Sequence, residues 1–368
     1  MKGLYIHIPF CKKKCDYCDF VSFADRGDCF EKYVLRLAEE MEEYNGENIN
    51  SIFIGGGTPT VLSPQLITRL CSDIKKKFNI SKNTEWTIEA NPGTLTDEKI
   101  SSVLEGGINR ISIGVQSFND DELKAIGRIH SAETAYNTVI NLKKAGFNNI
   151  SIDLMESLPL QTAQSFKNSL QTAVELPINH ISVYSLIIEE NTPLKAKYDS
   201  GVFTLPDEDS DRDLYAFTKE YLENFGFNRY EISNYAKKGY ESRHNLKYWN
   251  LDEYIGLGTA AHSFVGNRRF SNTEKLENYL DGQFRNAEES ELLSTDDIMG
   301  EYMMLGLRKT AGISKQEFKI RFKTDIKDVY GTVMEKYFRS GFMKEENGFI
   351  MLTDKGLDVS NSIMCEFI

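Results

Sequence analysis

Long uninterrupted apolar runs are absent from this chain of 368 residues. A membrane-spanning helix needs roughly 18 or more consecutive apolar residues, so we expect no membrane span. The first ten residues include a lysine, a histidine and a proline and lack a small-residue cleavage site. That is not the pattern of a secretory signal peptide, and we therefore expect a cytoplasmic protein.

The chain also lacks an excess of basic residues. Lys and Arg together number 43 against 55 Asp and Glu, which gives a formal net charge of −12. Because phosphate contacts need a basic surface, we expect no nucleic-acid partner. The acidic balance still allows a small anionic ligand that is held by a few local groups.

Cysteine is scarce and unevenly distributed. Of six cysteines, three lie within eight residues near the N-terminus and three are scattered. A secreted disulfide framework has many cysteines in a short chain, whereas thiols in the cytosol are kept reduced. We therefore expect no disulfide framework, and the group of three predicts a metal or cluster site.

Strand-like and helix-like segments alternate from the N-terminus to about residue 190. The strands that we expect are Leu4–Ile8, Ser51–Ile54, Glu85–Glu89, Arg110–Gly114, Asn149–Leu154 and His180–Leu186. The helices that we expect are Phe30–Tyr44, Pro64–Phe78, Asp97–Glu105, Ala132–Ala145 and Ala163–Leu176. Such alternation predicts parallel strands joined by right-handed crossovers.

Small and polar residues recur where the predicted strands end. The cysteine group follows the first strand, a Gly-Gly-Gly-Thr turn follows the second, and Glu89, Gln116 and Asp153 lie at the ends of the next three. In a parallel barrel the carboxyl ends of the strands form the ligand-binding rim. We therefore predict an α/β fold, a partial (β/α)6 barrel of the TIM type over residues 1–190, with one active-site mouth.

The rest of the chain divides into two parts. Residues 191–290 are aromatic and polar with no clear period, and we assign them to an extension of the barrel. Residues 291–368 predict a C-terminal helical, winged-helix-like domain in which acidic side chains outnumber basic ones, which favours packing or a protein partner over DNA. Its expected elements are helices at Thr295–Lys309, Ser314–Arg321 and Val329–Ser340 and a hairpin at Phe342–Thr353, turning at Asn347-Gly348.

The clustered cysteines have the spacing Cys11-x3-Cys15-x2-Cys18. Cysteine thiolates are the usual ligands of iron–sulfur clusters, and three of them can hold three irons of a 4Fe-4S cluster while the fourth iron stays open. The alternative is a structural zinc site, which needs a closed set of four ligands. The sequence offers no second Cys/His pair with that spacing, so the cluster is favoured.

With Tyr5 six residues before Cys11 and the turn Gly55-Gly56-Gly57-Thr58-Pro59, this spacing resembles that of radical S-adenosylmethionine (SAM) proteins. More narrowly, the chain is similar over nearly its whole length to the oxygen-independent coproporphyrinogen III oxidases and their relatives. The resemblance implies a 4Fe-4S cluster whose open iron binds S-adenosyl-L-methionine through its amino and carboxylate groups. Reductive cleavage would then yield methionine and a deoxyadenosyl radical.

The resemblance also implies a set of SAM-contacting residues. The glycine turn would hold the amino group of SAM, a guanidinium would suit its carboxylate, and acidic and amide side chains would suit its ribose. Two tyrosines match aromatic positions near the cluster and the adenine. Each residue alone is equally compatible with packing or a surface charge, so the prediction rests on the set. Its members are Tyr5, Tyr17, Gly56, Gly57, Thr58, Glu89, Gln116, Arg128 and Asp153.

Two departures from the oxidases weigh against coproporphyrinogen oxidation. The oxidases carry a fourth cysteine two residues after the third, and here that position is Phe20. They also carry an extended segment before the tyrosine, whereas four residues precede Tyr5 here.

A hexapeptide indicates a different function. His244-Asn245-Leu246-Lys247-Tyr248-Trp249 is similar to the HNxxYW motif of the haem chaperones called HemW, which are relatives of the oxidases. Neutral imidazole is a common axial ligand of haem iron, and the tyrosine and tryptophan could pack on a porphyrin. The alternative is that these side chains fill an interface below the barrel. His262 is a second candidate ligand.

Two functions therefore remain in view. The first is a haem chaperone that delivers haem to acceptor proteins, such as those of the respiratory chain, and carries the cluster and SAM. The second is a radical SAM enzyme that decarboxylates the propionates of coproporphyrinogen III. Phe20, the short N-terminus and the hexapeptide favour the chaperone, and the sequence leaves open whether SAM is cleaved.

Overall fold

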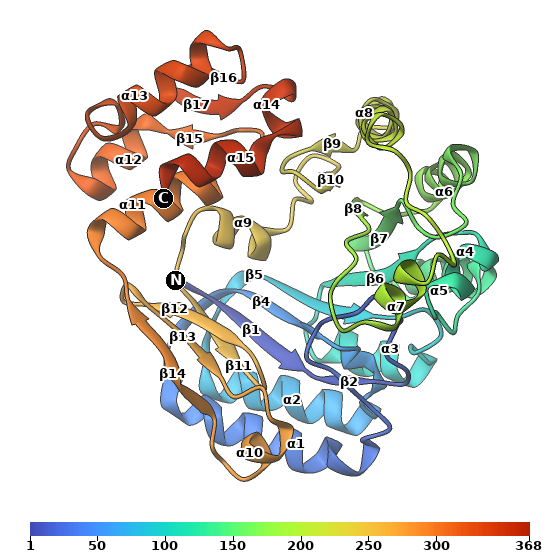
Figure 1. Ribbon diagram of the computed structural model, residues 1–368. Helices are drawn as coiled ribbons and strands as arrows, with labels where there is room; N and C mark the ends of the chain where they lie inside the picture. Colours follow the sequence, from blue (N-terminus) through green and yellow to red (C-terminus); the bar gives the residue numbers. More distant parts are fainter.

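The computed structural model describes the backbone of residues 1–368 and the side chains of all of them except those at positions 208 and 287–289. A twelve-stranded sheet with the order β14-β13-β12-β11-β1-β4-β5-β6-β7-β8-β10-β9 forms its centre. The sheet curves around the lower and right parts of the view, and the C-terminal domain lies at the upper left (Figure 1). No helix within the described residues is both long and apolar enough to cross a membrane.

The six predicted strands are neighbours in this sheet and pair in parallel. Most of their apolar side chains are buried, as expected for strands that are covered on both faces. The predicted α/β fold with a parallel sheet is confirmed. The strands are β1 (Lys2–Ile8), β4 (Asn48–Gly56), β5 (Asn79–Ala90), β6 (Arg110–Gln116), β7 (Ile150–Glu156) and β8 (His180–Ser185).

The crossover helices lie outside the curved sheet (Figure 1). Two of them begin at the residues expected to cap them: the Ser63 hydroxyl accepts a hydrogen bond from the N–H of Leu66, and that of Thr96 from the N–H of Lys99. Such caps satisfy N–H groups that have no partner within the helix. The helices are α1 (Phe30–Glu40), α2 (Pro64–Lys77), α3 (Asp97–Glu105), α4 (Asp120–Ala125), α5 (Ala132–Lys144) and α6 (Ala163–Glu175).

Residues 191–290 add strands to both edges of the sheet. At one edge β11 pairs in parallel with β1, and three antiparallel strands follow; at the other edge β10 and β9 pair antiparallel beyond β8. These strands are β9 (Asn228–Arg229), β10 (Asn234–Ala236), β11 (Tyr254–Leu257), β12 (His262–Val265), β13 (Arg268–Asn272) and β14 (Arg285–Leu292). The helices of this region are α7 (Pro193–Asp199), α8 (Glu208–Asn224), α9 (Arg243–Trp249) and α10 (Leu276–Leu280).

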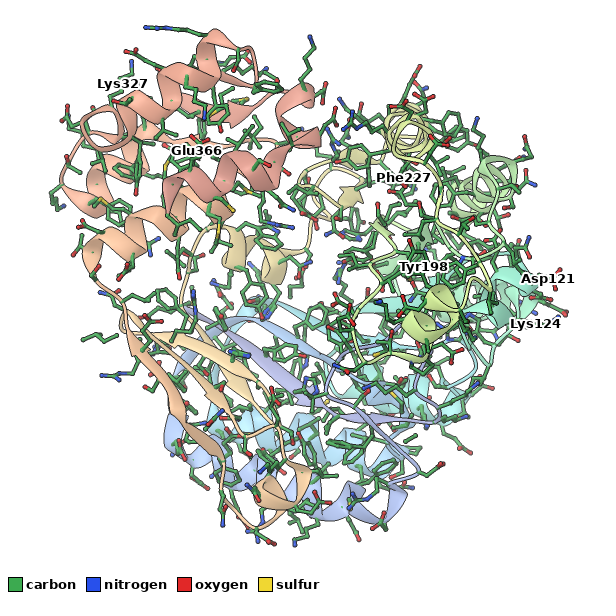
Figure 2. The ribbon with its side chains drawn as sticks, in the orientation of Figure 1. Asp121, Lys124, Tyr198, Phe227, Lys327 and Glu366 are labelled. Carbon is green, nitrogen blue, oxygen red and sulfur yellow. The ribbon has the colours of Figure 1, made fainter. Side chains whose placement is uncertain are left out.

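Helix α8 is the longest element that the sequence did not predict. Most of its 17 residues are polar, so the apolar period is weak. It is held by a few anchors: Leu214 and Leu222 join the barrel core together with Phe227, which follows the helix (Figure 2). Tertiary packing, rather than local pattern, therefore decides this helix.

The C-terminal domain has a core of its own. The three predicted helices and the hairpin are present, and the hairpin turns through Asn347 and Gly348, both with positive φ. A short strand between the first two helices pairs with the hairpin, which completes the winged-helix-like order. The elements are α11 (Thr295–Gly306), β15 (Ile313–Ser314), α12 (Lys315–Phe322), α13 (Ile326–Arg339), β16 (Met343–Glu346), β17 (Phe349–Leu352), α14 (Asp354–Asp358) and α15 (Ser360–Met364).

A buried carboxylate at the end of α1 joins the first crossover to the added strands. Glu40 accepts hydrogen bonds from the hydroxyl of Tyr279 at 2.6 Å, the amide of Asn272 at 2.7 Å, the N–H of Gly258 at 2.9 Å and the guanidinium of Arg285 at 2.9 Å. Burial raises the pKa of Glu40. A buried charge is tolerated when it is paired and fully hydrogen-bonded, and here four donors meet one side chain.

We expect Glu40→Ala to lower the free energy of unfolding by about 2–4 kcal/mol, because it leaves the Tyr279 hydroxyl and the Gly258 N–H buried without their acceptor and removes one partner of Arg285. Glu39→Ala is the matched control, since the Glu39 carboxylate is half exposed and pairs only with Arg36 on the same helix. Its effect should stay within about 1 kcal/mol. Urea unfolding followed by circular dichroism measures both, and equal losses would contradict the role of Glu40.

Candidate functional site

A cavity of about 410 Å³ opens at the carboxyl ends of the parallel strands. Its lining comes from the cysteine loop, from the turn after β4, and from the ends of β5, β6, β7 and β8. Most of the residues predicted to hold the cluster or SAM meet here, although the sequence separates them widely. Those lining the cavity are Cys11, Cys15, Tyr17, Cys18, Gly56, Gly57, Thr58, Glu89, Gln116, Arg128 and Asp153.

The cysteine loop is fixed from both sides. The N–H of Asp16 donates to the carbonyl of Ile126 at 3.1 Å, and the Asp16 carboxylate pairs with Lys197. Burial raises the pKa of the Cys11 and Cys18 thiols. All three cysteines are partly buried and free of disulfides. In the part of the chain that the structure describes, no three His, Cys, Asp or Glu side chains are grouped as ligands of a single metal ion.

The turn after β4 is built against the chain that leads into the cysteine loop. The N–H groups of Gly57 and Thr58 donate to the carbonyls of Ile8 and Phe10 at 2.9 and 2.7 Å. Gly56 has φ +109°, and a Cβ there would lie 2.4 Å from the His7 ring. A Cβ on Gly57 would lie 2.7 Å from the carbonyl oxygen of Phe10. Only glycine allows the two backbone segments to approach this closely.

Of the acidic side chains that line the cavity, the two on the barrel strands, Glu89 and Asp153, have no salt-bridge partner within the described residues. Glu89, at the end of β5, accepts a hydrogen bond from the N–H of Gly56 at 3.1 Å, and Asp153, on β7, accepts one from the hydroxyl of Ser112 at 3.4 Å. Burial and the nearby Asp153 raise the pKa of Glu89 to about 7, and burial also raises the pKa of Asp153. A ligand with positive charge would relieve this desolvation.

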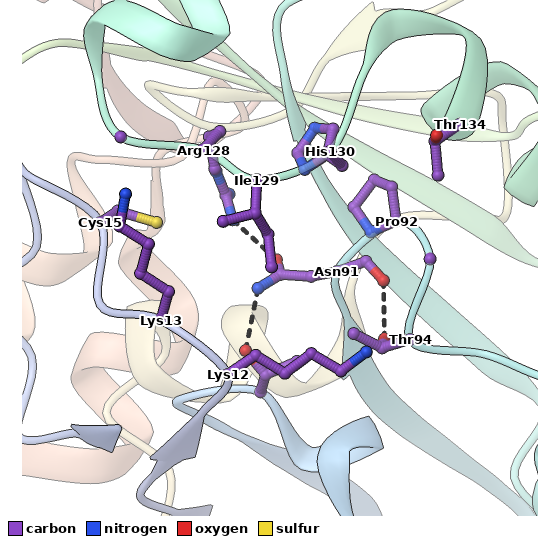
Figure 3. A pocket seen from close by; sticks show the side chains of 13 residues that line it. Lys12, Lys13, Cys15, Asn91, Pro92, Thr94, Arg128, Ile129, His130 and Thr134 are labelled. Atoms are coloured by element: carbon purple, nitrogen blue, oxygen red, sulfur yellow. Dashed lines mark hydrogen bonds between the residues drawn. The ribbon is translucent and has the colours of Figure 1, made fainter. Parts of the chain in front are cut away.

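Arg128 closes one side of the cavity through a chain of hydrogen bonds (Figure 3). Its guanidinium donates to the Asn91 side-chain oxygen at 2.9 Å, and the Asn91 amide donates to the Thr58 hydroxyl at 2.8 Å. The Thr58 hydroxyl in turn donates to the sulfur of Cys11 at 3.6 Å. The Nε of Arg128 is buried without a partner in the protein, and the guanidinium carbon lies 6.0 Å from the ring centroid of Tyr17.

Asn91 is a site residue that sequence reasoning missed. Its one signal was its position two residues after Glu89, directly beyond the end of a strand. With Arg128 and Thr58 it also borders a smaller hollow of about 230 Å³ on the outer side of the cysteine loop (Figure 3). Lys12 and His130 line that hollow, and the cavity and the hollow share Cys15.

Gln116 lies at a strained end of a strand. Its φ is +68°, and the pairing of β6 with β7 shifts register between Gly114 and Gln116. A non-glycine residue in this conformation is uncommon, and such strain is concentrated at functional sites. The shift leaves the side chain of Gln116 among those that line the cavity.

Tyr5 lies apart from this group. It does not line the cavity; its hydroxyl shares a hydrogen bond with Nδ1 of His7 at 2.9 Å, and its ring stacks on Phe53 with centroids 6.3 Å apart. Burial raises the pKa of Tyr5. The side chain therefore reaches the cavity lining through His7, whose ring lies against Gly56.

His244 does not line the cavity either. The residue is 1% exposed and lies on α9. Its Nδ1 shares a hydrogen bond with the hydroxyl of Ser51 at 3.0 Å, and its Nε2 shares one with the hydroxyl of Tyr248 at 2.9 Å. Burial, followed by the charge of Lys247, lowers the pKa of His244 to about 3. The ring is therefore neutral, and neither nitrogen is free for a ligand in this structure.

The other parts of the hexapeptide are engaged as well. The Trp249 ring has the guanidinium carbon of Arg308 4.4 Å from its centroid, and the Tyr248 ring packs edge-on against Tyr254. Helix α9 lies between the barrel and the C-terminal domain (Figure 1). The arrangement differs from the predicted porphyrin-facing motif and agrees with the alternative, a packed interface. His262, on β12, is exposed.

Comparison with known proteins places these features in a family. The family model of the radical SAM superfamily matches residues 5–173. The family model of the HemN C-terminal domain matches residues 293–359. "Heme chaperone HemW" of Lactococcus lactis is 38% identical over 99% of this chain and 96% of its own length. The proteins of the same name from Bacillus subtilis and Escherichia coli are 36% and 33% identical over 100% of this chain and 99% and 98% of theirs.

A solved structure has the same fold. Coproporphyrinogen III oxidase (HemN) from Escherichia coli, described as a radical SAM enzyme, superposes with a TM-score of 0.86 over 99% of this chain and 89% of its own, at 22% identity. The barrel, the added strands and the C-terminal domain are thus shared across the full length. By this fold and by the identity with the full-length relatives, the chain belongs to the radical SAM superfamily and, within it, to the HemW family.

Proposed function

We propose that this protein is a haem chaperone that carries a 4Fe-4S cluster and SAM and passes haem to acceptor proteins. The observation that supports it most is the likeness to heme chaperones along the entire chain, combined with a rim cavity that gathers the predicted cysteines and SAM residues. We further propose a cytoplasmic location, because the thiols of an iron–sulfur site need a reducing compartment.

In this proposal the thiolates of Cys11, Cys15 and Cys18 hold the cluster. They belong to one loop whose backbone is tied to the barrel, and all three line the same cavity. The donor set suits iron–sulfur chemistry, and three ligands leave one iron for SAM. The cluster would supply the electron that reductive SAM cleavage requires, while Thr58 orients the sulfur of Cys11.

We expect anaerobic reconstitution to give about four irons and four sulfides per chain in the wild type. Cys15→Ala should lose the cluster, because two thiolates on a short loop cannot hold a cubane. Cys365→Ala is the control, since Cys365 is exposed and far along the chain from the loop. Iron and sulfide analysis with electron paramagnetic resonance measures all three proteins, and a full cluster in Cys15→Ala would contradict the ligand assignment.

The charge pattern of the cavity suits SAM, which has a cationic sulfonium, an amino group and a carboxylate. Glu89 and Asp153 provide carboxyl groups whose ionised form a cationic ligand would stabilise, and the unpartnered Nε of Arg128 provides a donor for a carboxylate. The backbone of Gly56 and Gly57 and the side chain of Gln116 complete the lining, and Tyr17 offers an aromatic face. Tyr5 would act from the layer beneath, by holding His7 against the glycine turn.

We expect Arg128→Gln and Asp153→Asn each to weaken SAM binding by about 1.5–3 kcal/mol while the cluster stays intact, because each removes one charge-assisted contact. Lys124→Gln is the control: Lys124 pairs with Asp121 on the surface of α4 (Figure 2) and does not line the cavity. Calorimetric titration of the reconstituted proteins with SAM gives the affinities. Unchanged affinity in both cavity variants would contradict the proposed pocket.

The oxidase is the second candidate, supported by the common fold with coproporphyrinogen III oxidase. Against it stands Phe20, which lines the cavity at the position where the sequence comparison expects a fourth cysteine. A phenylalanine can neither bind a metal nor exchange protons, so this position contributes contact surface alone.

We expect haemin to bind the reconstituted protein at about one haem per chain, with a shifted Soret band. We expect no decarboxylation of coproporphyrinogen III under anaerobic conditions with SAM and a reductant. Absorption titration and chromatographic analysis of the porphyrin products measure the two activities side by side. Sustained decarboxylation without haem binding would favour the oxidase.

A further inference from the structure

The cavity is too small to hold a porphyrin in addition to its proposed contents. At about 410 Å³ it lies at the low end of the range for sites of drug-sized ligands. The cluster would occupy the side of Cys11, Cys15 and Cys18, and SAM the floor between Glu89 and Arg128. A flat macrocycle can then reach this site only by lying across its opening.

Large apolar side chains surround that opening and remain in contact with solvent. Phe20, on the cysteine loop, is 64% exposed, and Ile187, after β8, is 68% exposed. Tyr184, at the end of β8, is 42% exposed. All three line the same cavity, although Phe20 follows the first of the six parallel strands and the other two lie at the last. Exposed apolar groups gathered around one opening mark an interaction site, and their flat or branched faces suit a planar apolar ligand.

Positive charge lies at the same opening. Lys13 and Lys14 are exposed and line the cavity, and the Lys14 ammonium donates to the carbonyl of Phe20 at 2.9 Å. Two acidic residues also line the cavity at this level, Asp19 on the cysteine loop and Glu189 beyond β8, so the lysines at positions 13 and 14 face a mixed rather than a purely basic rim. In a chain with a net charge of −12, neighbouring lysines beside an apolar surface provide a local match for a ligand with an apolar face and carboxylates at one edge.

We propose that haem binds across this mouth, with the macrocycle against Phe20, Tyr184 and Ile187 and the propionates toward Lys13 and Lys14. The inference rests on the proposed function and names the site at which it operates. His244 is then a packing residue: its ring is buried, and both of its nitrogens have hydrogen-bond partners.

The test uses the full chain with its cluster reconstituted and saturated with SAM, titrated with haemin and followed by the Soret band. We expect the double variant Phe20→Ser/Ile187→Ser to lose affinity by roughly tenfold or more, since two apolar contacts are removed. We expect Lys13→Gln/Lys14→Gln to weaken binding several-fold and to reduce its dependence on salt. In each variant the iron content and the SAM affinity should equal those of the wild type.

Two controls make the result specific. Ile320→Ser removes an apolar side chain of similar exposure, 60%, from α12 of the C-terminal domain, and it should bind haemin like the wild type. His244→Gln should also bind like the wild type once circular dichroism shows that it is folded.

Each contrary outcome has its own meaning. Unchanged haemin affinity in both the Phe20/Ile187 and the Lys13/Lys14 variants (the mouth variants) overturns this inference. A loss of affinity confined to His244→Gln also overturns it, because that result assigns haem binding to the hexapeptide. Equal losses in the mouth variants and in Ile320→Ser also overturn it, because they indicate non-specific adsorption. A wild type that binds no haemin overturns the proposed function itself.

Discussion

Two backbone hydrogen bonds organise the site: the N–H groups of Gly57 and Thr58 donate to the carbonyls of Ile8 and Phe10. They fix the turn after β4 to the segment that enters the cysteine loop. The Thr58 hydroxyl is hydrogen-bonded to the sulfur of Cys11 on one side. On the other side, hydrogen bonds connect it through Asn91 to Arg128. The proposed cluster ligands and the proposed SAM residues therefore belong to one connected unit, which requires glycine at two successive positions.

The sequence was sufficient to locate the parallel strands, since each is a short apolar run that ends in small or polar residues. The rim residues could be predicted for the same reason, because parallel strands bring their carboxyl ends together. Helix α8 and the strands β9 to β14 were not predicted. They are polar or short, and they are stabilised by pairing with the sheet edges and by distant contacts such as that of Glu40 with Arg285.

Depth within the fold was the other property that the sequence could not reveal. Tyr5 and His244 belong to recognisable motifs, yet neither side chain lines the cavity, and His244 is almost completely buried. The partner of the His244 Nδ1 is Ser51, which is 193 positions away in the chain. Burial lowers the pKa of His7, His180 and His244 alike, so these histidines are neutral hydrogen-bonding groups of the barrel interior. A motif can thus identify a family while, in the site that we propose, its histidine serves packing.

Position 20 affects both the metal-binding capacity and the surface of the site. Relative to the oxidase pattern, Phe20 removes a thiol that could bind metal, and in the structure it adds apolar surface at the mouth of the cavity. A radical enzyme benefits from a closed site that excludes water, whereas a carrier must release its cargo to a partner. Exposed contact groups at an open rim, rather than a buried axial ligand, are the arrangement that allows release without unfolding the barrel. The substitution that weakens the case for oxidation therefore provides surface that the chaperone function needs.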